Sequence, residues 1–155
     1  MTPFEKYLHA VIMRADQEAR EDGSTTVEAQ HLLLAVAGEQ EPTTRALLAA
    51  AGLDRDAVHA ALEQEFVRSL SAVGVSSTAY ALPPASWRRA HPKMGTSGKL
   101  VLERTFTVSR KKDLRPAHVL LGILLAQAGT VPRALALAGV DQEELTARVR
   151  QSLEN

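Results

Sequence analysis

The sequence contains no cysteine and few aromatic residues, and these scarcities exclude several classes of protein. Among 155 residues there are three Phe, two Tyr and one Trp. Without cysteine the chain has no disulfide framework and no thiolate for catalysis or metal binding. No apolar run approaches the roughly 20 residues that a membrane-spanning helix needs, and no apolar segment with a cleavage site follows the amino terminus. We therefore expect a cytoplasmic protein without membrane contact.

Sequence patterns of catalysis and of metal or cofactor binding are also missing. No two of the five histidines have the four-residue spacing of a helical zinc site. The segment from Gly95 to Leu100 contains a lysine, but its glycine spacing is not that of a phosphate-binding loop, and Leu100 has no hydroxyl for Mg²⁺. No Gly-x-Ser-x-Gly motif marks a nucleophile. The sequence predicts no catalytic residue, no metal and no cofactor, and hence not an enzyme.

Charge is balanced in total but not along the chain. Residues 1–71 hold 12 acidic and 6 basic side chains, and residues 72–155 hold 6 acidic and 12 basic ones. From Arg88 to Arg115, nine lysines and arginines stand against two acids. This basic segment is a candidate site for an anion or nucleic acid. Because it has few aromatics and no nucleic-acid-binding motif, we expect a solvated surface and regard nucleic-acid binding as the weakest alternative.

An internal repeat organises the chain. The run from His31 to Ala37 returns as the run from His118 to Leu124, 87 residues later. The same offset relates Gly52-Leu53-Asp54 to Gly139-Val140-Asp141. Two motifs that share one register indicate a duplication rather than a chance match.

Each repeat is expected to hold four helices, which predicts an all-α fold of eight helices in two pseudo-symmetric sets. Repeat 1 spans residues 1–71, a linker spans 72–97 and repeat 2 spans 98–155, together as one domain. Capping residues and proline mark the expected helix starts, and glycine marks the ends. The predicted starts in repeat 1 are Thr2 with Pro3, Thr26 with Val27, Pro42 or Thr43, and Asp54. Those of the second set are Thr96-Ser97, Pro116, Gly129 and Asp141.

Local pattern alone leaves part of repeat 2 ambiguous. The segment from Thr105 to Val108 suits a strand, and only the duplication favours a helix there.

The fourth helix of repeat 1 is expected to bury one face, made of Val58, Ala61, Leu62 and Phe66.

The paired repeats resemble the Clp amino-terminal domain, the double Clp-N module at the front of ClpA- and ClpC-type unfoldases. The resemblance covers nearly the whole chain. It rests on Phe4, Val11-Ile12, Ala15, Glu18-Ala19, His31 to Leu34 and Gly52-Leu53 in repeat 1, and on Lys99, Val101 to Glu103, Phe106, His118 to Leu125 and Gly139 to Asp141 in repeat 2. Since no phosphate-binding loop is present, the chain resembles a stand-alone Clp-N protein without the AAA+ modules.

The resemblance implies an apolar groove between the first helices of the two repeats, which accepts peptides in relatives. The matching positions are Phe4, His9, Ile12 and Met13 in repeat 1, and Met94, Lys99, Leu102 and Glu103 in repeat 2. Helical spacing alone would also fit ordinary core packing at the apolar positions, and methionine serves equally as gap-filler or ligand contact. For His31 and His118 we expect a structural role, with the imidazole hydrogen-bonded near a helix start.

Two departures from the family argue against recognition of phosphorylated arginine. Relatives often have glutamate before each repeat histidine, where this chain has Gln30 and Ala117. The Phe-Thr pair that opens each family repeat is Phe4-Glu5 and Met94-Gly95 here. Both changes remove partners for a guanidinium-phosphate group.

The function implied by the resemblance is non-catalytic binding of peptides, or of unfolded or tagged proteins, in connection with Clp proteolysis. In one version the protein is a decoy that sequesters peptides or cyclic peptide antibiotics in the groove. The alternative is an adaptor or accessory subunit that docks on the Clp ATPase or protease.

Overall fold

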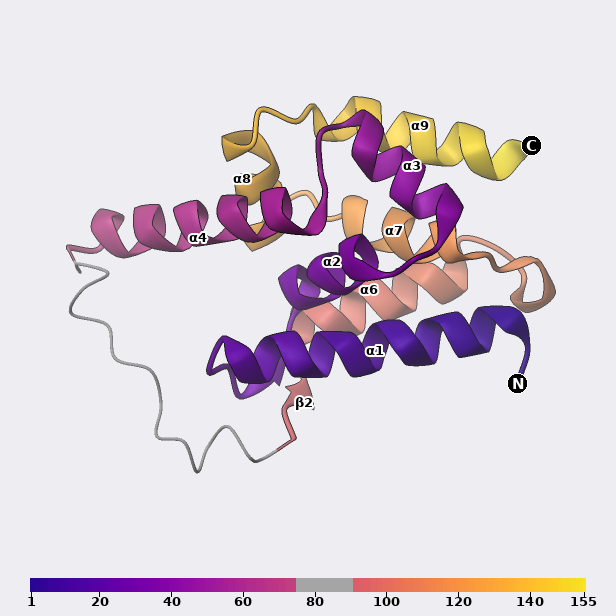
Figure 1. The fold of residues 1–155 in the computed structure, drawn as a ribbon, viewed down its shortest axis with the longest axis horizontal. Coiled ribbons are helices and arrows are strands. Elements are labelled where there is room, and N and C mark those ends of the chain that lie inside the picture. The colour runs from indigo at the N-terminus through magenta and orange to yellow at the C-terminus, as the bar shows by residue number, and fades with distance from the viewer. Residues whose placement is uncertain (75–90) are drawn as a thin grey trace.

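Two short and almost wholly apolar helices lie at the centre of the fold (Figure 1). They are α2 (Ala29–Gly38) and α7 (Pro116–Leu124), and each belongs to a different repeat. Every residue from His31 to Ala37 and from Ala117 to Leu124 is buried. A helix that is apolar on all sides needs neighbours on all sides. No helix in the described part of the chain combines the length and apolar character needed to cross a membrane.

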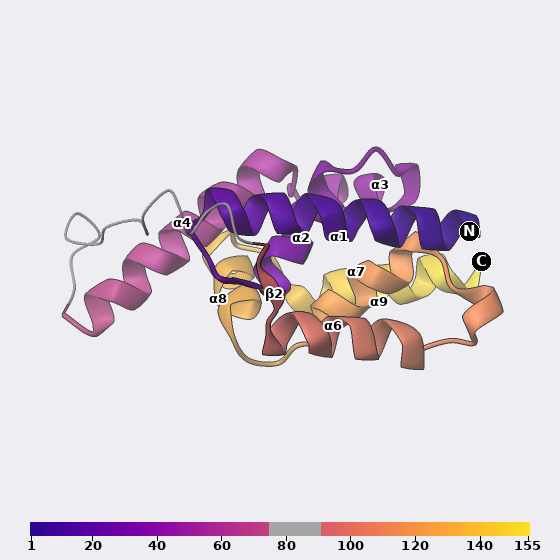
Figure 2. The same ribbon diagram turned by 90° about the horizontal axis from the view of Figure 1, so that it is seen from below.

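The surrounding helices come from both repeats (Figures 1 and 2). The computed structural model describes residues 1–74 and 91–155, and these residues form eight α-helices, as predicted. Besides α2 and α7 they are α1 (Pro3–Glu21), α3 (Pro42–Ala50), α4 (Arg55–Ala72), α6 (Thr96–Thr107), α8 (Thr130–Leu137) and α9 (Gln142–Glu154). One 3₁₀ turn, Lys111–Asp113, precedes α7. The linker predicted at residues 72–97 is described only at its ends, which belong to α4, to a short strand and to α6.

The 87-residue repeat is reproduced in backbone detail where α3 and α8 end. Gly52 and Gly139 both have a φ of +74°, a conformation that costs glycine little. The amide that follows each glycine donates to the carbonyl oxygen five residues back, over 2.8 and 3.0 Å. Both helices thus end in the same Schellman motif. The aspartate after each motif, Asp54 or Asp141, then caps the next helix with its side chain.

A two-stranded parallel ladder joins the repeats. Strand β1 (Thr26–Val27) pairs with β2 (Lys93–Met94), and the Gly95 amide donates to the Val27 carbonyl oxygen over 2.9 Å. The helix start predicted at Val27 is therefore wrong, because α2 begins at Ala29. Backbone groups in β1 bond to a segment far along the chain, and no local signal of helix capping could show that partner.

Next to the ladder, α2 and α6 cap each other. The Glu28 carboxylate, just before α2, accepts hydrogen bonds from the Ser97 amide over 3.2 Å and from the Ser97 hydroxyl over 2.7 Å. The Ser97 hydroxyl oxygen accepts a hydrogen bond from the Ala29 amide over 2.8 Å. A helix start leaves amide groups without partners in its own helix. Each repeat therefore supplies the acceptor that a helix of the other repeat needs.

Of the remaining predictions about helices, one is confirmed and one is wrong. Thr105–Thr107 is helical, as the duplication indicated against the local strand pattern. On α4, Val58 and Ala61 are buried, but Phe66 is 42% exposed, so its predicted burial is wrong. The reason is visible in Figure 2, where the carboxyl-terminal half of α4 projects beyond the other helices.

Removal of the Glu28 side chain is expected to destabilise the whole domain. In Glu28→Ala the Ser97 amide and hydroxyl lose their charged acceptor, and hydrogen bonds to charged groups contribute about 1.5–3 kcal/mol. We expect the free energy of unfolding, measured by urea denaturation at pH 7, to fall by about 2 kcal/mol. The exposed Glu103 of α6 is a matched control, and Glu103→Ala should change stability by less than about 0.5 kcal/mol. Equal losses in the two variants would contradict the cross-repeat cap.

Candidate functional site

One helix from each repeat contributes to the same face of the molecule. α1 and α6 run antiparallel with α2 and α7 between and behind them (Figure 2). The Phe4 ring, near the start of α1, meets the Phe106 ring, near the end of α6, edge to face with centroids 6.3 Å apart. Side chains four residues apart lie along one side of each helix. We define the α1–α6 face by Phe4, Leu8, Ile12, Leu102 and Phe106.

The structure places the eight predicted groove residues on α1, β2 and α6. The apolar ones that are half-buried are Phe4, Ile12, Met94 and Leu102. The exposed ones are His9, Lys99 and Glu103, together with Met13, whose exposed fraction is 55%. The Phe4–Phe106 contact brings the start of α1 and the end of α6 together. A ligand role for these residues stays a prediction.

Phe106 is part of the face that the groove prediction left out. It is 48% exposed although it is a large aromatic side chain. The signal in the sequence is its spacing of four residues from Leu102, which makes the two neighbours on a helix. That signal was weak because Thr105 to Val108 also fits a strand.

Two glycines hold α6 close to its neighbours and so fix its position relative to α1. A Cβ at Gly98 would lie 2.5 Å from the Val27 carbonyl oxygen in β1. A Cβ at Gly122 in α7 would lie 2.7 Å from the Thr105 hydroxyl oxygen of α6. Both distances are shorter than a van der Waals contact. Any larger residue at these positions would push α6 away from the ladder or from α7.

His31 and His118 occupy equivalent places in the two repeats. Each lies in the first turn of its helix, and its Nδ1 accepts a hydrogen bond from the amide before that helix, of Glu28 over 2.9 Å or of Arg115 over 2.8 Å. A neutral imidazole that accepts at Nδ1 carries its proton on Nε2. In repeat 1 this Nε2 lies 3.0 Å from a carboxylate oxygen of Asp22. The bonds tie each helix start to its imidazole.

Ser24, Asp22 and His31 come together in an arrangement that differs from a catalytic triad. The Ser24 hydroxyl donates to Asp22 over 2.9 Å and does not bond to the imidazole. Asp22 and the Glu28 amide engage both nitrogens of His31, so neither is free to take a proton from a nucleophile. The hydrogen bond from His31 lowers the pKa of Asp22 and keeps that carboxylate ionised. Within the described residues, no group of three or more His, Asp and Glu side chains is placed to hold a metal ion.

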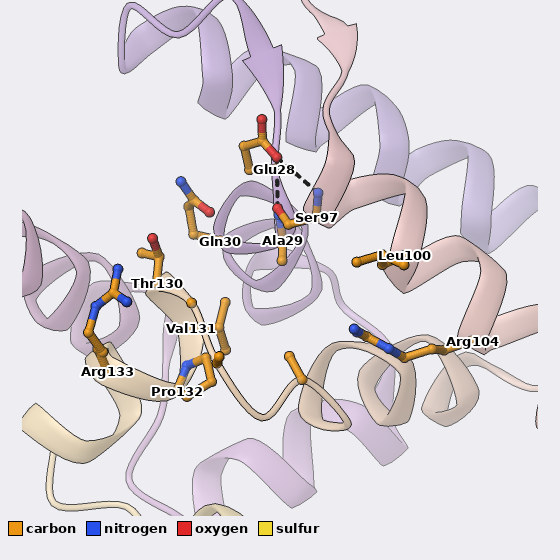
Figure 3. A pocket seen from close by; sticks show the side chains of 13 residues that line it. Glu28, Ala29, Gln30, Ser97, Leu100, Arg104, Thr130, Val131, Pro132 and Arg133 are labelled. Carbon is orange, nitrogen blue, oxygen red and sulfur yellow. Dashed lines mark hydrogen bonds between the residues drawn. The ribbon is translucent and has the colours of Figure 1, made fainter.

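The first turn of α6 already holds a carboxylate, that of Glu28 (Figure 3). Free amide groups and the helix dipole attract negative charge to such a turn. Burial works to raise the pKa of the Glu28 carboxyl, but hydrogen bonds from Thr26 and Ser97 outweigh it and hold the pKa below its usual value. A Cβ at Gly95 would lie only 1.9 Å from a Glu28 oxygen, so the contact requires glycine there.

A cavity of about 280 Å³ opens beside this carboxylate (Figure 3). Gln30 lies on its wall, at the position where relatives often have glutamate. A phosphate group arriving at the first turn of α6 would meet the negative charge of Glu28 and would have to displace it. This gives a physical reason, additional to Gln30 itself, for the expectation that phosphorylated arginine is not recognised here.

The basic segment from Arg88 to Arg115 is spread over α6 and the turns that flank it. Arg104 donates to the Gly122 carbonyl oxygen over 3.0 Å, and Arg110 pairs with Asp113 over 3.0 Å. Residues 88–90 lie outside the described residues. The described basic side chains that are exposed are Lys93, Lys99, Arg110, Lys111, Lys112 and Arg115. Nothing in this arrangement favours nucleic-acid binding over a solvated surface.

Comparison with protein families matches residues 3–87 to the family described as the Clp repeat N-terminal domain. This match covers more than half of the chain. The chain belongs to the Clp repeat N-terminal domain family. Such Clp-N domains are non-catalytic modules that bind substrates and adaptors of Clp ATPases.

Structural comparison supports the same fold for the whole Clp-N chain. The crystal structure of the N-terminal domain of the caseinolytic protease associated chaperone ClpD from Arabidopsis thaliana superposes with a TM-score of 0.67. The match covers 99% of this chain and 98% of that chain, at 22% sequence identity. At this identity the likeness concerns the fold. No curated protein matches the sequence of this Clp-N domain.

The burial of His118 predicts a pH dependence of stability. Burial lowers the pKa of His118, so below the ordinary histidine pKa of about 6.5 the unfolded chain binds a proton that the folded chain resists. Stability should therefore fall as the pH drops from about 7 to about 5. His118→Gln keeps an acceptor for the Arg115 amide and does not titrate. Thermal unfolding at several pH values should show a smaller loss for this variant, whereas parallel curves would contradict the assignment. The exposed His9 gives the control His9→Gln.

Proposed function

We propose that this Clp-N domain acts in the cytoplasm as a decoy that binds peptides, including cyclic peptides, on the α1–α6 face and so keeps them from a Clp unfoldase. The observation that carries the proposal is the Phe4–Phe106 pair, which joins the first helices of the two repeats while Phe106 stays 48% exposed. Single exposed apolar residues are normal on protein surfaces. Here the exposed Phe106 lies beside half-buried apolar residues of α1 and α6, and a cluster of this kind is typical of a binding surface.

The chemistry of the face favours apolar peptides over charged ligands. Phe4, Ile12 and Leu102 are half-buried, so a ligand would cover apolar surface that the fold leaves partly open. Met13 follows Ile12 in α1, and Met94 lies in β2 just before α6. The unbranched thioether side chain adapts to ligands of different shape. The charged residues Lys99 and Glu103 are exposed and of opposite sign, so they favour neither anions nor cations.

Binding without further processing is the simplest role for such a module. The sequence contains no phosphate-binding loop with which to couple peptide binding to ATP hydrolysis. A bound peptide would therefore be held rather than unfolded by this chain. Held in this way, a toxic cyclic peptide would be kept away from the corresponding face of an unfoldase.

Calorimetric titration with a cyclic peptide that binds Clp amino-terminal domains tests the proposal. We expect one-to-one binding, and a rise in the stability of the domain of about 2.7 kcal/mol when the peptide is present at 100 times its Kd. The absence of binding would refute the decoy. Capture of a purified Clp ATPase or protease by the same protein would then support the alternative, an adaptor or accessory subunit.

Residue-level variants locate the binding surface. Phe4→Ala and Leu102→Ala should each weaken binding of the cyclic peptide by about tenfold, because central apolar contacts dominate such interfaces. Met13→Ala removes an exposed side chain and tests the border of the face with little risk to folding. Val73, which is 74% exposed at the end of α4, provides the control Val73→Ala. Normal binding by folded Phe4→Ala and Leu102→Ala variants would show that the ligand binds elsewhere.

A further inference from the structure

A second and larger cavity lies away from the α1–α6 face. It has a volume of about 550 Å³, within the range of ligand-binding clefts. Its walls come from the carboxyl-terminal end of α1, from α2, from the middle of α4 and from Thr130 at the start of α8. The segment of α4 that lines it borders the half-helix that projects from the molecule in Figure 2. We call this feature the α4 cavity.

Among the described residues, the α4 cavity is lined by acidic side chains and by no lysine or arginine. Its five described carboxylates belong to Glu18, Glu21, Asp22, Glu63 and Glu65. These acids come from two helices, so the negative charge belongs to the cavity and not to a single helix face.

Three acids of the α4 cavity, the buried Glu18 and Glu65 and the exposed Asp22, already have partners within the fold. Glu18 pairs with Arg55 over 2.6 Å and Glu65 pairs with Arg133 over 2.8 Å. Asp22 accepts hydrogen bonds from Ser24 and contacts His31. These three carboxylates are therefore part of the structure and are not available in full to a ligand.

The acids at the rim are different. Glu21 is exposed at the end of α1, and the Glu63 side chain is 71% exposed on α4, where His59 lies 3.8 Å away. Neither rim carboxylate is paired with a lysine or arginine among the described residues. A visiting cation would meet them without displacing any internal ion pair.

Between these acids the wall of the α4 cavity has an apolar part, which adjoins polar residues such as Gln30 and Thr130. Leu34 and Leu62 form its inner part, and Phe66 and Val67 its outer part. The last two side chains are 42% and 44% exposed. An apolar surface beside a negatively charged rim fits a ligand that carries both an apolar side chain and positive charges.

We propose that the α4 cavity binds a positively charged peptide segment of a partner protein, one that has a bulky apolar side chain between arginines or lysines. The apolar side chain packs against Leu62 and Val67, and the flanking cations lie beside Glu21 and Glu63. This site is separate from the α1–α6 face and does not depend on the function proposed for that face.

Fluorescence anisotropy with three labelled peptides tests the site on the full chain. The first peptide alternates arginine and leucine over seven residues, the second has alanine in place of leucine, and the third has glutamate in place of arginine. The first should bind, and 0.5 M salt should weaken its binding because the rim charges are exposed to solvent. The second should bind about tenfold more weakly, since it lacks the apolar anchor. The third should not bind.

Substitutions of rim residues test whether the peptide binds in the α4 cavity. Glu21→Gln combined with Glu63→Gln should weaken the arginine–leucine peptide about fivefold, because exposed ion pairs are individually weak. Val67→Ser should also weaken it, and both changes affect exposed side chains that do not hold the fold. Glu143→Gln combined with Glu154→Gln removes the same charge from exposed positions on α9 and should change nothing.

Three results would overturn the proposal. They are equal binding of the arginine and glutamate peptides, equal effects of the α4-cavity and α9 double variants, and loss of binding in Leu102→Ala. The last result would place the peptide on the α1–α6 face. Failure of the cyclic peptide to bind would leave this proposal unaffected, so the two sites are tested independently.

Discussion

The structure depends on the mutual capping of α2 and α6. Glu28 accepts the amide and hydroxyl of Ser97, and Ser97 accepts the amide of Ala29, so each helix begins against a side chain of the other repeat. The β1–β2 ladder precedes this contact and aligns the two chain segments that enter it. Because α6 is held here and by close packing at Gly98, its position relative to α1 is fixed. The α1–α6 face therefore exists only when both repeats are folded together.

The duplication explains why both repeats have a histidine in the first turn of an apolar helix. The surroundings of that histidine differ between the repeats. The histidine at the start of α2 contacts Asp22 through its second nitrogen, whereas for His118 the largest influence on the pKa is burial, which lowers it. The position that precedes the apolar helix is Glu28 in repeat 1 and Arg115 in repeat 2. The acid fills the first turn of α6. Glu28 thus joins the two helices and occupies the place at which an anion would meet the free amides of that turn.

Local interactions were predictable from the sequence, and contacts between distant segments were not. The predicted helix starts at Thr2 and Asp54 depend on neighbours within three residues, and the structure confirms both as caps. The strand at Thr26–Val27 was missed because its partner, Lys93–Met94, lies far along the chain in the segment predicted as a linker. The exposure of Phe66 could not be predicted either, because helical spacing gives the inner face of α4 but not the point at which the helix leaves the core. Resemblance to a family supplied the candidate groove residues, which composition and spacing alone would assign to a core.

The central claim is that Glu28 and Ser97 act together across the repeats, and a double-mutant cycle measures this most directly. Urea unfolding of the wild type, Glu28→Ala, Ser97→Ala and the double variant gives the coupling energy between the two side chains. Residues in direct contact couple by about 0.5–3 kcal/mol, and we expect at least about 1 kcal/mol here because the acceptor is charged. Losses that add within about 0.3 kcal/mol would show that the two side chains act independently and would contradict the account.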